Sequence, residues 1–219
     1  MAGEDSPETT RLLRALDRTF RFLPQTMRAH SFTNEQIGEI MSETRDEYRR
    51  LIPQTPFIGG KRNRFFTRML VEAAHSLALF NVLRRGGMSA AEVGPLIVEA
   101  FRKRVFHYPR FARRLVGGLA FHPRVLRRLQ RRADASQARE YPDDWVFRFI
   151  PGDGKSFDYG VDYEECAIIK FYRRHGADDL APYCCQLDFP LSDALGWGLR
   201  RTMTLAEGGA KCDFRFKRG

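Results

Sequence analysis

The most reactive side chains of this 219-residue chain are the thiols of its four cysteines. All four lie in the last third of the chain, at positions 166, 184, 185 and 212. Their spacings fit no CxxC zinc pattern, and the five histidines form no HExxH or similar metal-binding pair. If residues 179–187 form a helix, Cys184 falls on its apolar stripe and packs in the core. Cys185 then points to the same side as Asp188, three residues further on. The sequence therefore predicts a thiol–carboxylate pair at Cys185 and Asp188.

The other two cysteines are ambiguous. Cys212 alternates with Phe214 and Phe216, which places it on the apolar face of a strand. Cys166 follows two glutamates and falls in the first turn of a predicted helix, where backbone N–H groups lower a thiol pKa and the glutamates oppose this. For each cysteine taken alone, core packing is the favoured explanation, because free cysteine is among the most buried residue types.

The first two thirds of the chain carry the signals of helices. A capping box at Thr33 and Gln36 opens a helix that reaches Leu51, and apolar spacing marks a second helix over residues 66–83. A further capping box at Ser89 and Glu92 opens a third helix. Pro95 falls inside it and predicts a kink, or a late start near residue 96.

The pattern changes to strands near Tyr141. Period-two alternation over 145–150, a Pro-Gly-Asp-Gly turn and a returning strand at 157–161 predict one hairpin, and residues 201–206 with 211–217 predict a second. Residues 163–174 suit a strand or a helix, and their length favours a helix. We expect an α+β fold, a helical N-terminal half packed on a small antiparallel sheet formed by C-terminal hairpins. Residues 1–140 would be the helical region and 141–219 the α+β region with the cysteines, together one compact domain.

The net charge of +10 comes from one segment. Residues 101–140 hold twelve Lys or Arg against two acids, interrupted by Pro109 and Pro123. Such a segment could bind nucleic acid, an anionic lipid surface or an acidic partner, or be the solvated side of amphipathic helices. Nucleic-acid binding is the weakest of these because no recognition-helix arrangement is evident.

Composition excludes several classes of protein. With 43% hydrophobic residues the chain can build a core, yet no apolar run approaches the roughly 20 residues of a membrane span. Residues 1–7 lack the basic-then-apolar order of a secretory signal, and four cysteines make no disulfide framework, so we expect a reducing cytoplasm. No Walker loop or GxGxxG motif supports nucleotide binding.

The C-terminal motifs resemble one protein family. Residues 157–167 (FDYGVDYEECA), 176–182 (GADDLAP), Cys185-x-x-Asp188 and the closing run 201–216 are similar to the L-2-amino-thiazoline-4-carboxylic acid hydrolase family. The resemblance covers roughly residues 145–217, and Cys166, Cys185 and Cys212 match the family's cysteine pattern, whereas Cys184 is an extra. It implies a hydrolase that opens a small cyclic amidine, in the namesake case giving N-carbamoyl-L-cysteine.

The resemblance also implies roles for particular residues. Cys185 would attack the substrate's C2 carbon, with Asp188 handling protons, while Cys166 and Cys212 line the pocket. Arg201 would hold the substrate carboxylate, with neighbouring Arg200 as the other choice.

Two questions stay open at this stage. Trp197, between two glycines, could wall the pocket or pack in the core. A metal version would bind one divalent ion such as zinc through Cys166, Cys185 and Cys212. The alternative class is a non-catalytic module that binds a small ligand or metal through a cysteine cluster, and the oligomeric state is left open.

Overall fold

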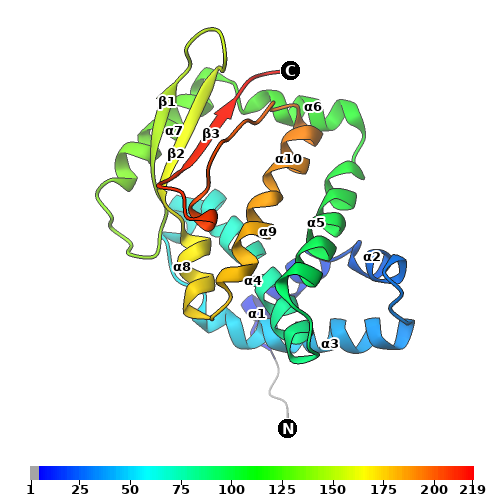
Figure 1. The fold of residues 1–219 in the computed structure, drawn as a ribbon. Coiled ribbons are helices and arrows are strands. Elements are labelled where there is room, and N and C mark those ends of the chain that lie inside the picture. Colours follow the sequence, from blue (N-terminus) through cyan, green and yellow to red (C-terminus); the bar gives the residue numbers. More distant parts are fainter. Residues whose placement is uncertain (1–4) are drawn as a thin grey trace. The chain divides into compact units, whose positions relative to one another are not determined.

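The chain folds into two compact units, the first reaching Arg104 and the second running from Val105 to Gly219 (Figure 1). The computed structural model describes residues 5–219. The sequence places the change from helices to strands near residue 140, whereas the boundary between the units follows Arg104. It lies earlier because helices α6 (Arg110–Leu119) and α7 (Pro123–Ser136) belong to the same unit as the strands. That the whole chain forms one compact domain stays a prediction.

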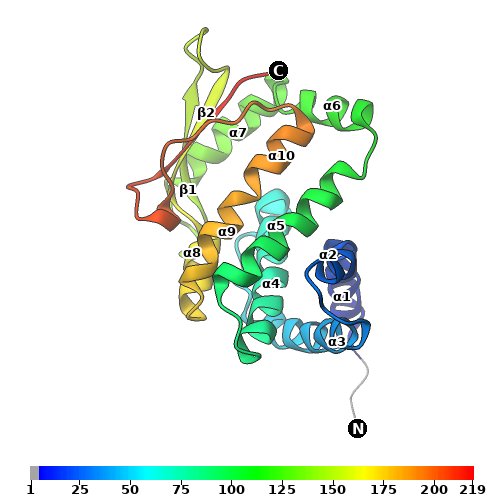
Figure 2. The same ribbon diagram turned by 45° about the vertical axis from the view of Figure 1, so that its right-hand side comes forward.

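The first unit is helical (Figure 2). Its elements are α1 (Pro7–Thr19), α2 (Leu23–Ala29), α3 (Asn34–Leu51), the short 3-10 helices Ile52–Gln54 and Gly60–Asn63, α4 (Arg64–Arg85) and α5 (Ala90–Phe106), which crosses the boundary. The capping box at Thr33 and Gln36 is confirmed, with both hydrogen bonds formed. The late start near residue 96 is wrong, since α5 begins at Ala90 and continues through Pro95. Hydrogen bonds from the Ser89 backbone and hydroxyl to Glu92 fix this earlier start.

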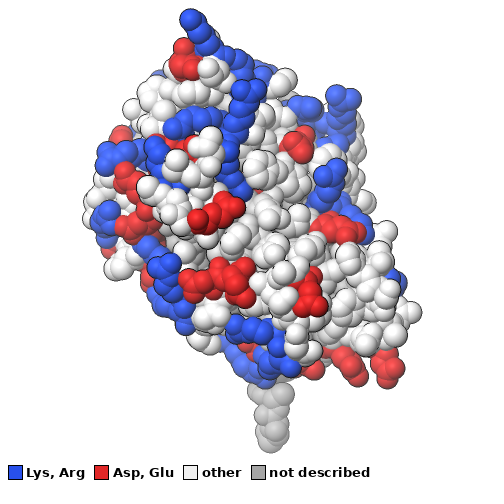
Figure 3. Space-filling view, viewed as in Figure 1, with Lys and Arg blue, Asp and Glu red and all other residues white. Residues whose placement is uncertain are grey.

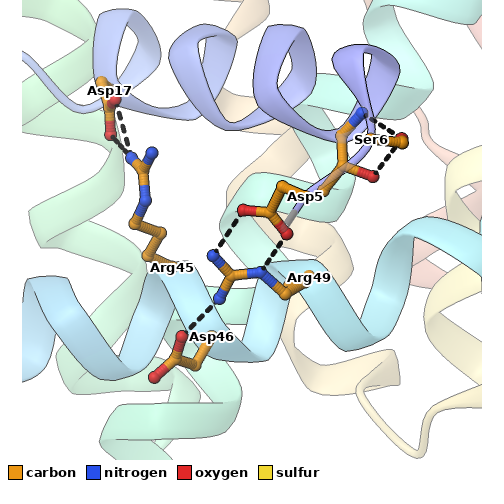
Figure 4. A network of polar contacts seen from close by, with 7 residues as sticks. Asp5, Ser6, Asp17, Arg45, Asp46 and Arg49 are labelled. Carbon is orange, nitrogen blue, oxygen red and sulfur yellow. Dashed lines mark hydrogen bonds and ion pairs between the residues drawn. The ribbon is translucent and has the colours of Figure 1, made fainter. Parts of the chain in front are cut away.

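Ion pairs tie α1 to α3 on the surface of this unit (Figure 4). Arg45 of α3 pairs with Asp17 of α1 at 2.7 Å, and Arg49 of α3 pairs with Asp5, just before α1, at 2.9 Å. Arg49 also pairs with Asp46 within α3 at 2.5 Å. Exposed pairs of this kind each contribute about 0–1 kcal/mol. The apolar core between the helices therefore supplies most of the stability of the first unit.

His75 of α4 lies in that core without contact to solvent. Its Nδ1 is 3.0 Å from the Thr19 hydroxyl, and its ring meets Tyr48 edge-on with centroids 4.5 Å apart. Nε2 has no hydrogen-bond partner among residues 5–219. Burial, aided by the charges of Arg104 and Arg18, lowers the pKa of His75 to about 3, so the imidazole is neutral at pH 7.

This buried imidazole makes stability depend on pH. The unfolded chain protonates His75 below its ordinary pKa of 6.5 while the folded chain does not, so stability is lost as the pH falls below that value. Between pH 7 and 5 the loss assignable to His75 is about 2 kcal/mol. We expect urea denaturation to show this loss as the difference between the wild type and His75→Gln, which cannot titrate. His107→Gln, at an exposed position, should keep the wild-type slope, and an unchanged slope in His75→Gln would contradict the assignment.

The second unit contains a three-stranded antiparallel sheet in the order β1-β2-β3. The strands are β1 (Val146–Pro151), β2 (Tyr159–Glu165) and β3 (Cys212–Phe216), accompanied by α6, α7, α8 (Ala167–Arg174), α9 (Ala181–Gln186), α10 (Asp188–Leu195) and the 3-10 turns Asp178–Leu180 and Leu205–Glu207. The first predicted hairpin is confirmed, and Pro109 and Pro123 do divide the basic segment into separate helices. The α+β class is therefore correct.

The second predicted hairpin is wrong. β3 pairs with β2 instead, and residues 201–206 form no strand. Arg200, just before them, forms an isolated β-bridge with Arg215. The Asp213 carboxylate accepts hydrogen bonds from the backbone N–H groups of Thr202 and Met203 and from the Thr202 hydroxyl. Because the side chain takes these donors, the segment cannot offer them to a neighbouring strand.

The ambiguous segment 163–174 divides at Cys166. β2 continues to Glu165, and α8 follows from Ala167, so the predicted helix is correct only in its second part.

The hydropathy of the helices and the distribution of charge can be compared with the predictions made from composition. No helix within residues 5–219 combines the length and apolar character needed to cross a membrane. On the face shown in Figure 3, basic and acidic side chains are interspersed.

Candidate active site

The predicted thiol–carboxylate pair lies where α9 meets α10. Cys185 is in α9 and Asp188 opens α10, and Leu187 between them keeps helical backbone angles (φ −62°, ψ −22°). The turn from Cys185 to Asp188 is therefore helical throughout, and the i, i+3 spacing puts both side chains on one side.

Asp188 forms an ion pair with Arg201. A guanidinium nitrogen of Arg201 donates to Asp188 Oδ2 at 2.8 Å, and only 7% of the Arg201 side chain is exposed, against 28% for Asp188. The guanidinium carbon also lies 4.6 Å from the ring centre of Phe189 and 5.4 Å from that of Phe214. Arg201 is thus held in place by contacts within the protein, and its role in binding the substrate carboxylate stays a prediction.

The carboxyl of Asp188 titrates near neutral pH. Removal from water raises its pKa to about 6, and the charge and hydrogen bond of Arg201 oppose part of that rise. A carboxyl with this pKa exchanges a proton readily under physiological conditions, which is the property required of a general acid or base.

Cys212 is the first residue of β3 and lies opposite Tyr163 in the β2–β3 ladder. Its sulfur accepts a hydrogen bond from the backbone N–H of Leu205 at 3.2 Å. Burial raises the pKa of the Cys212 thiol, while the Leu205 N–H and the charge of Arg201 lower it. The apolar face predicted for Cys212, Phe214 and Phe216 is confirmed by ring contacts with β2.

Cys166 is the N-cap residue of α8. Burial raises the pKa of its thiol to about 11, although the backbone N–H groups of Ile169 and Ile168 favour the thiolate. The sequence left open whether the helix N-terminus would lower the pKa of Cys166 more than the preceding glutamates raise it. In the structure, desolvation raises this pKa more than the helix N-terminus lowers it.

The three family-matching thiols and the carboxylate influence one another. Burial first, and then the charges of Cys184, Cys166, Asp188 and Cys212, raise the pKa of the Cys185 thiol far above its ordinary value. The charge of Cys212 also raises the pKa of Cys166. The fold therefore gathers these side chains from three separate segments into one electrostatic neighbourhood, in which the thiols are protonated at neutral pH.

Two tyrosines of this neighbourhood were missed in the sequence. The pKa of Tyr163 is raised by burial and then by Asp188 and Cys166, and the pKa of Tyr172 is raised by burial and then by the neighbouring cysteines. The alternation along β2 could have indicated Tyr163, since it shares a face with Tyr159 and Val161. No comparable signal distinguishes Tyr172 from other apolar residues of α8.

Trp197 lies elsewhere. Its indole Nε1 donates to the Gly117 carbonyl at 3.1 Å, and its ring meets Phe216 edge-on. Phe216 and Cys212 are at opposite ends of β3, about 13 Å apart at the usual strand rise. The structure therefore gives Trp197 a packing role and does not bring it to the thiols.

The described residues do not fit a metal centre. Within residues 5–219, no group of three His, Cys, Asp or Glu side chains stands close enough to hold an ion. The four cysteines are free thiols. We therefore derive no step through zinc bound by Cys166, Cys185 and Cys212.

The second unit is thus an α+β scaffold in which protonated thiols share an electrostatic neighbourhood with a carboxyl whose pKa is about 6. The protein-family model of L-2-amino-thiazoline-4-carboxylic acid hydrolase matches residues 69–216, and the chain belongs to this family. The match begins in α4, well before the motifs that show the resemblance by eye. No curated protein and no solved structure matches the chain significantly.

Breaking the ion pair of the candidate site should lower the free energy of unfolding far more than breaking an ion pair on the surface. Arg201→Gln removes the counter-charge that opposes the desolvation of Asp188 and leaves that carboxyl without its partner, so we expect a loss of about 3–5 kcal/mol in the free energy of unfolding at pH 7.5. Arg173→Gln breaks the exposed pair with Asp178 (3.0 Å) in the same unit and should cost less than about 1 kcal/mol. Equal losses in the two variants, measured by urea denaturation, would contradict the buried pair.

Proposed function

We propose that the protein hydrolyses a small cyclic amidine of the aminothiazoline type, and that Asp188 moves the proton. The observation that carries this proposal is the carboxyl with a pKa of about 6, part exposed at 28%, among the family-matching cysteines. Membership of the family supports the reaction class.

The proton transfers follow from the substrate and its product. N-carbamoyl-L-cysteine keeps both nitrogens of the ring compound and gains a free thiol, so the bond that breaks is C2–S. Water attacks C2 and forms the new C–O bond, while Asp188 accepts a proton from this water. The same carboxyl then donates that proton to the departing sulfur, which leaves as a thiol, and the second proton of the water passes to the former ring nitrogen as the C2=O bond of the product forms. A carboxyl with a pKa of about 6 is acidic enough to protonate a thiolate, whose ordinary pKa is about 8.5.

We favour water over Cys185 as the nucleophile, because water can lose its proton to Asp188 during its attack on C2, whereas a cysteine attacks as a preformed thiolate. Transfer of the Cys185 proton to Asp188 runs from a thiol whose pKa lies above 9.0 to a carboxyl at about 6. A gap of that size costs at least about 4 kcal/mol before any bond forms. We therefore assign Cys185, Cys166 and Cys212 to the wall of the pocket, and attack by the Cys185 thiolate is the second mechanism.

Arg201 has donors left for the substrate. A guanidinium carries five N–H groups, and one donates to Asp188. We propose that remaining N–H groups bind the substrate carboxylate. Two exposed apolar side chains are available nearby, Phe189 against the guanidinium and Met203 two residues along the chain. An apolar lining with few polar anchors is usual for small-molecule sites.

A binding module without turnover is the other class to be tested. It would hold the ring compound through the same residues and release it unchanged. The cytoplasmic location stays part of the proposal, supported by four cysteines that are all free thiols.

Three variants separate these possibilities. Asp188→Asn should reduce turnover of the aminothiazoline carboxylate by about 10²–10⁴-fold, because the proton carrier is lost. Cys184→Ser is the matched control next to the site and should retain activity. With water as nucleophile, Cys185→Ser also keeps most of the turnover, whereas its complete loss would favour the thiolate mechanism.

The pH profile provides a check that does not depend on folding of a variant. Since Asp188 acts as a base only when ionised, kcat/KM should fall tenfold per pH unit below about 6. A flat profile through this range, or full activity in folded Asp188→Asn, would contradict the role of Asp188. Saturable binding without product formation would favour the binding module.

A further inference from the structure

Helix α6 presents its large apolar side chains to solvent, while Gly117 and part of Arg113 face the protein. The buried residue of α6 is Gly117, and a Cβ there would collide with the backbone carbonyl of Leu195 in α10. Figures 1 and 2 both place α6 beside the C-terminal end of α10. Amphipathic helices of globular proteins normally bury their apolar face against the core.

The arginines of α6 explain this reversed orientation. Arg113 donates to the Ala194 carbonyl at 3.1 Å, close to the C-terminus of α10, and Arg114 lies against Gly196, which ends that helix in a left-handed conformation (φ 74°). Cations stabilise the negative end of a helix dipole. These contacts and the close approach at Gly117 fix the rotation of α6 about its axis, and in this orientation its large apolar side chains face outward.

The outward face is large and continuous. Phe111 is 77% exposed and Leu115 is 72% exposed, and with Leu119 they follow an i, i+4, i+8 row along the helix. Further exposed apolar side chains adjoin this row in the sequence: Phe106, Tyr108, Val116 and Val125. Exposed patches of this kind mark interaction sites rather than ordinary surface.

The same segment carries an unbalanced positive charge. The sequence contains no Asp or Glu from Phe101 to Ala133. Several exposed arginines form no ion pair with a carboxylate among the residues that the structure describes: Arg110, Arg114, Arg124, Arg127, Arg128 and Arg131. An open hollow next to α7, lined by Phe121, Leu126 and the cationic Lys217 and Arg218 with Asp158, continues the same mixture of apolar and basic groups.

We propose that α6 and the residues before it, Phe106–Leu119, bind the surface of an anionic phospholipid bilayer. The apolar row enters the interface between headgroups and acyl chains, and the surrounding arginines contact lipid phosphates. Nucleic acid would use the arginines but leave Phe111 and Leu115 in water. A second copy of the chain would cover the apolar row but bring two strongly basic segments together. Of these three surfaces, the bilayer alone matches both features, and this inference does not depend on the proposed reaction.

Vesicle flotation tests the proposal with the full chain. The wild type should float with vesicles of phosphatidylcholine and phosphatidylglycerol and bind pure phosphatidylcholine weakly. Phe111→Ser with Leu115→Ser should lower the partition coefficient about 10–100-fold, given the transfer energies of the two side chains. Arg124→Gln with Arg128→Gln should weaken binding mainly at low salt. Phe65→Ser, at a position 66% exposed in the first unit, is the matched control and should bind as the wild type does.

Other outcomes would overturn the proposal. The substituted positions are exposed, so the variants should keep the wild-type circular dichroism and unfolding midpoint. Equal flotation of wild type and the Phe111/Leu115 variant would contradict it. So would a wild-type dimer that ignores vesicles and dissociates in this variant, since the face would then join two copies. Binding to duplex DNA, unchanged in the variant and without vesicle binding, would assign the segment to nucleic acid instead.

Discussion

The candidate site depends on one buried ion pair, between Asp188 and Arg201. Desolvation alone would keep the carboxyl protonated well above pH 6, and a fully solvated arginine partner would hold it ionised at all physiological pH values. The pKa of about 6 is the balance of these opposite effects. The guanidinium can be buried because Phe189 and Phe214 cover it while its hydrogen bond to Asp188 satisfies its charge. The pair thereby connects the start of α10 with the segment that precedes β3.

The thiols around this pair differ from those of cysteine nucleophiles. An activated cysteine needs a cationic neighbour or a helix N-terminus strong enough to stabilise the thiolate. Cys166 has such a helix N-terminus, yet burial still raises its pKa to about 11. Cys185 has acidic neighbours that disfavour a thiolate further. Protonated sulfurs form a polarisable, weakly polar lining, which suits a sulfur-containing ring better than it suits covalent attack.

Local signals in the sequence predicted most elements but not their partners. The capping box at Thr33, the breaks at Pro109 and Pro123 and the first hairpin depend on neighbouring residues, so they were predicted correctly. β3 alternates in the same way whether it pairs with residues 201–206 or with β2, and the side chain of Asp213 decides between them. The spacing of Cys185 and Asp188 was readable because it is a single helical turn. The engagement of Arg201 was not, since it requires tertiary contacts. Periodicity likewise indicated an amphipathic segment but could not tell which face of α6 is exposed.

The segment that carries Arg201 is fastened at three places along its length. The bridge between Arg200 and Arg215 holds its start, the Asp213 carboxylate holds the next two residues, and the sulfur of Cys212 holds Leu205. All three anchors come from β3, so this segment can swing away only if several hydrogen bonds break together. In the proposed reaction, substrate entry and product release would therefore require side-chain rotation or motion on the α9–α10 side, while Arg201 would keep its position.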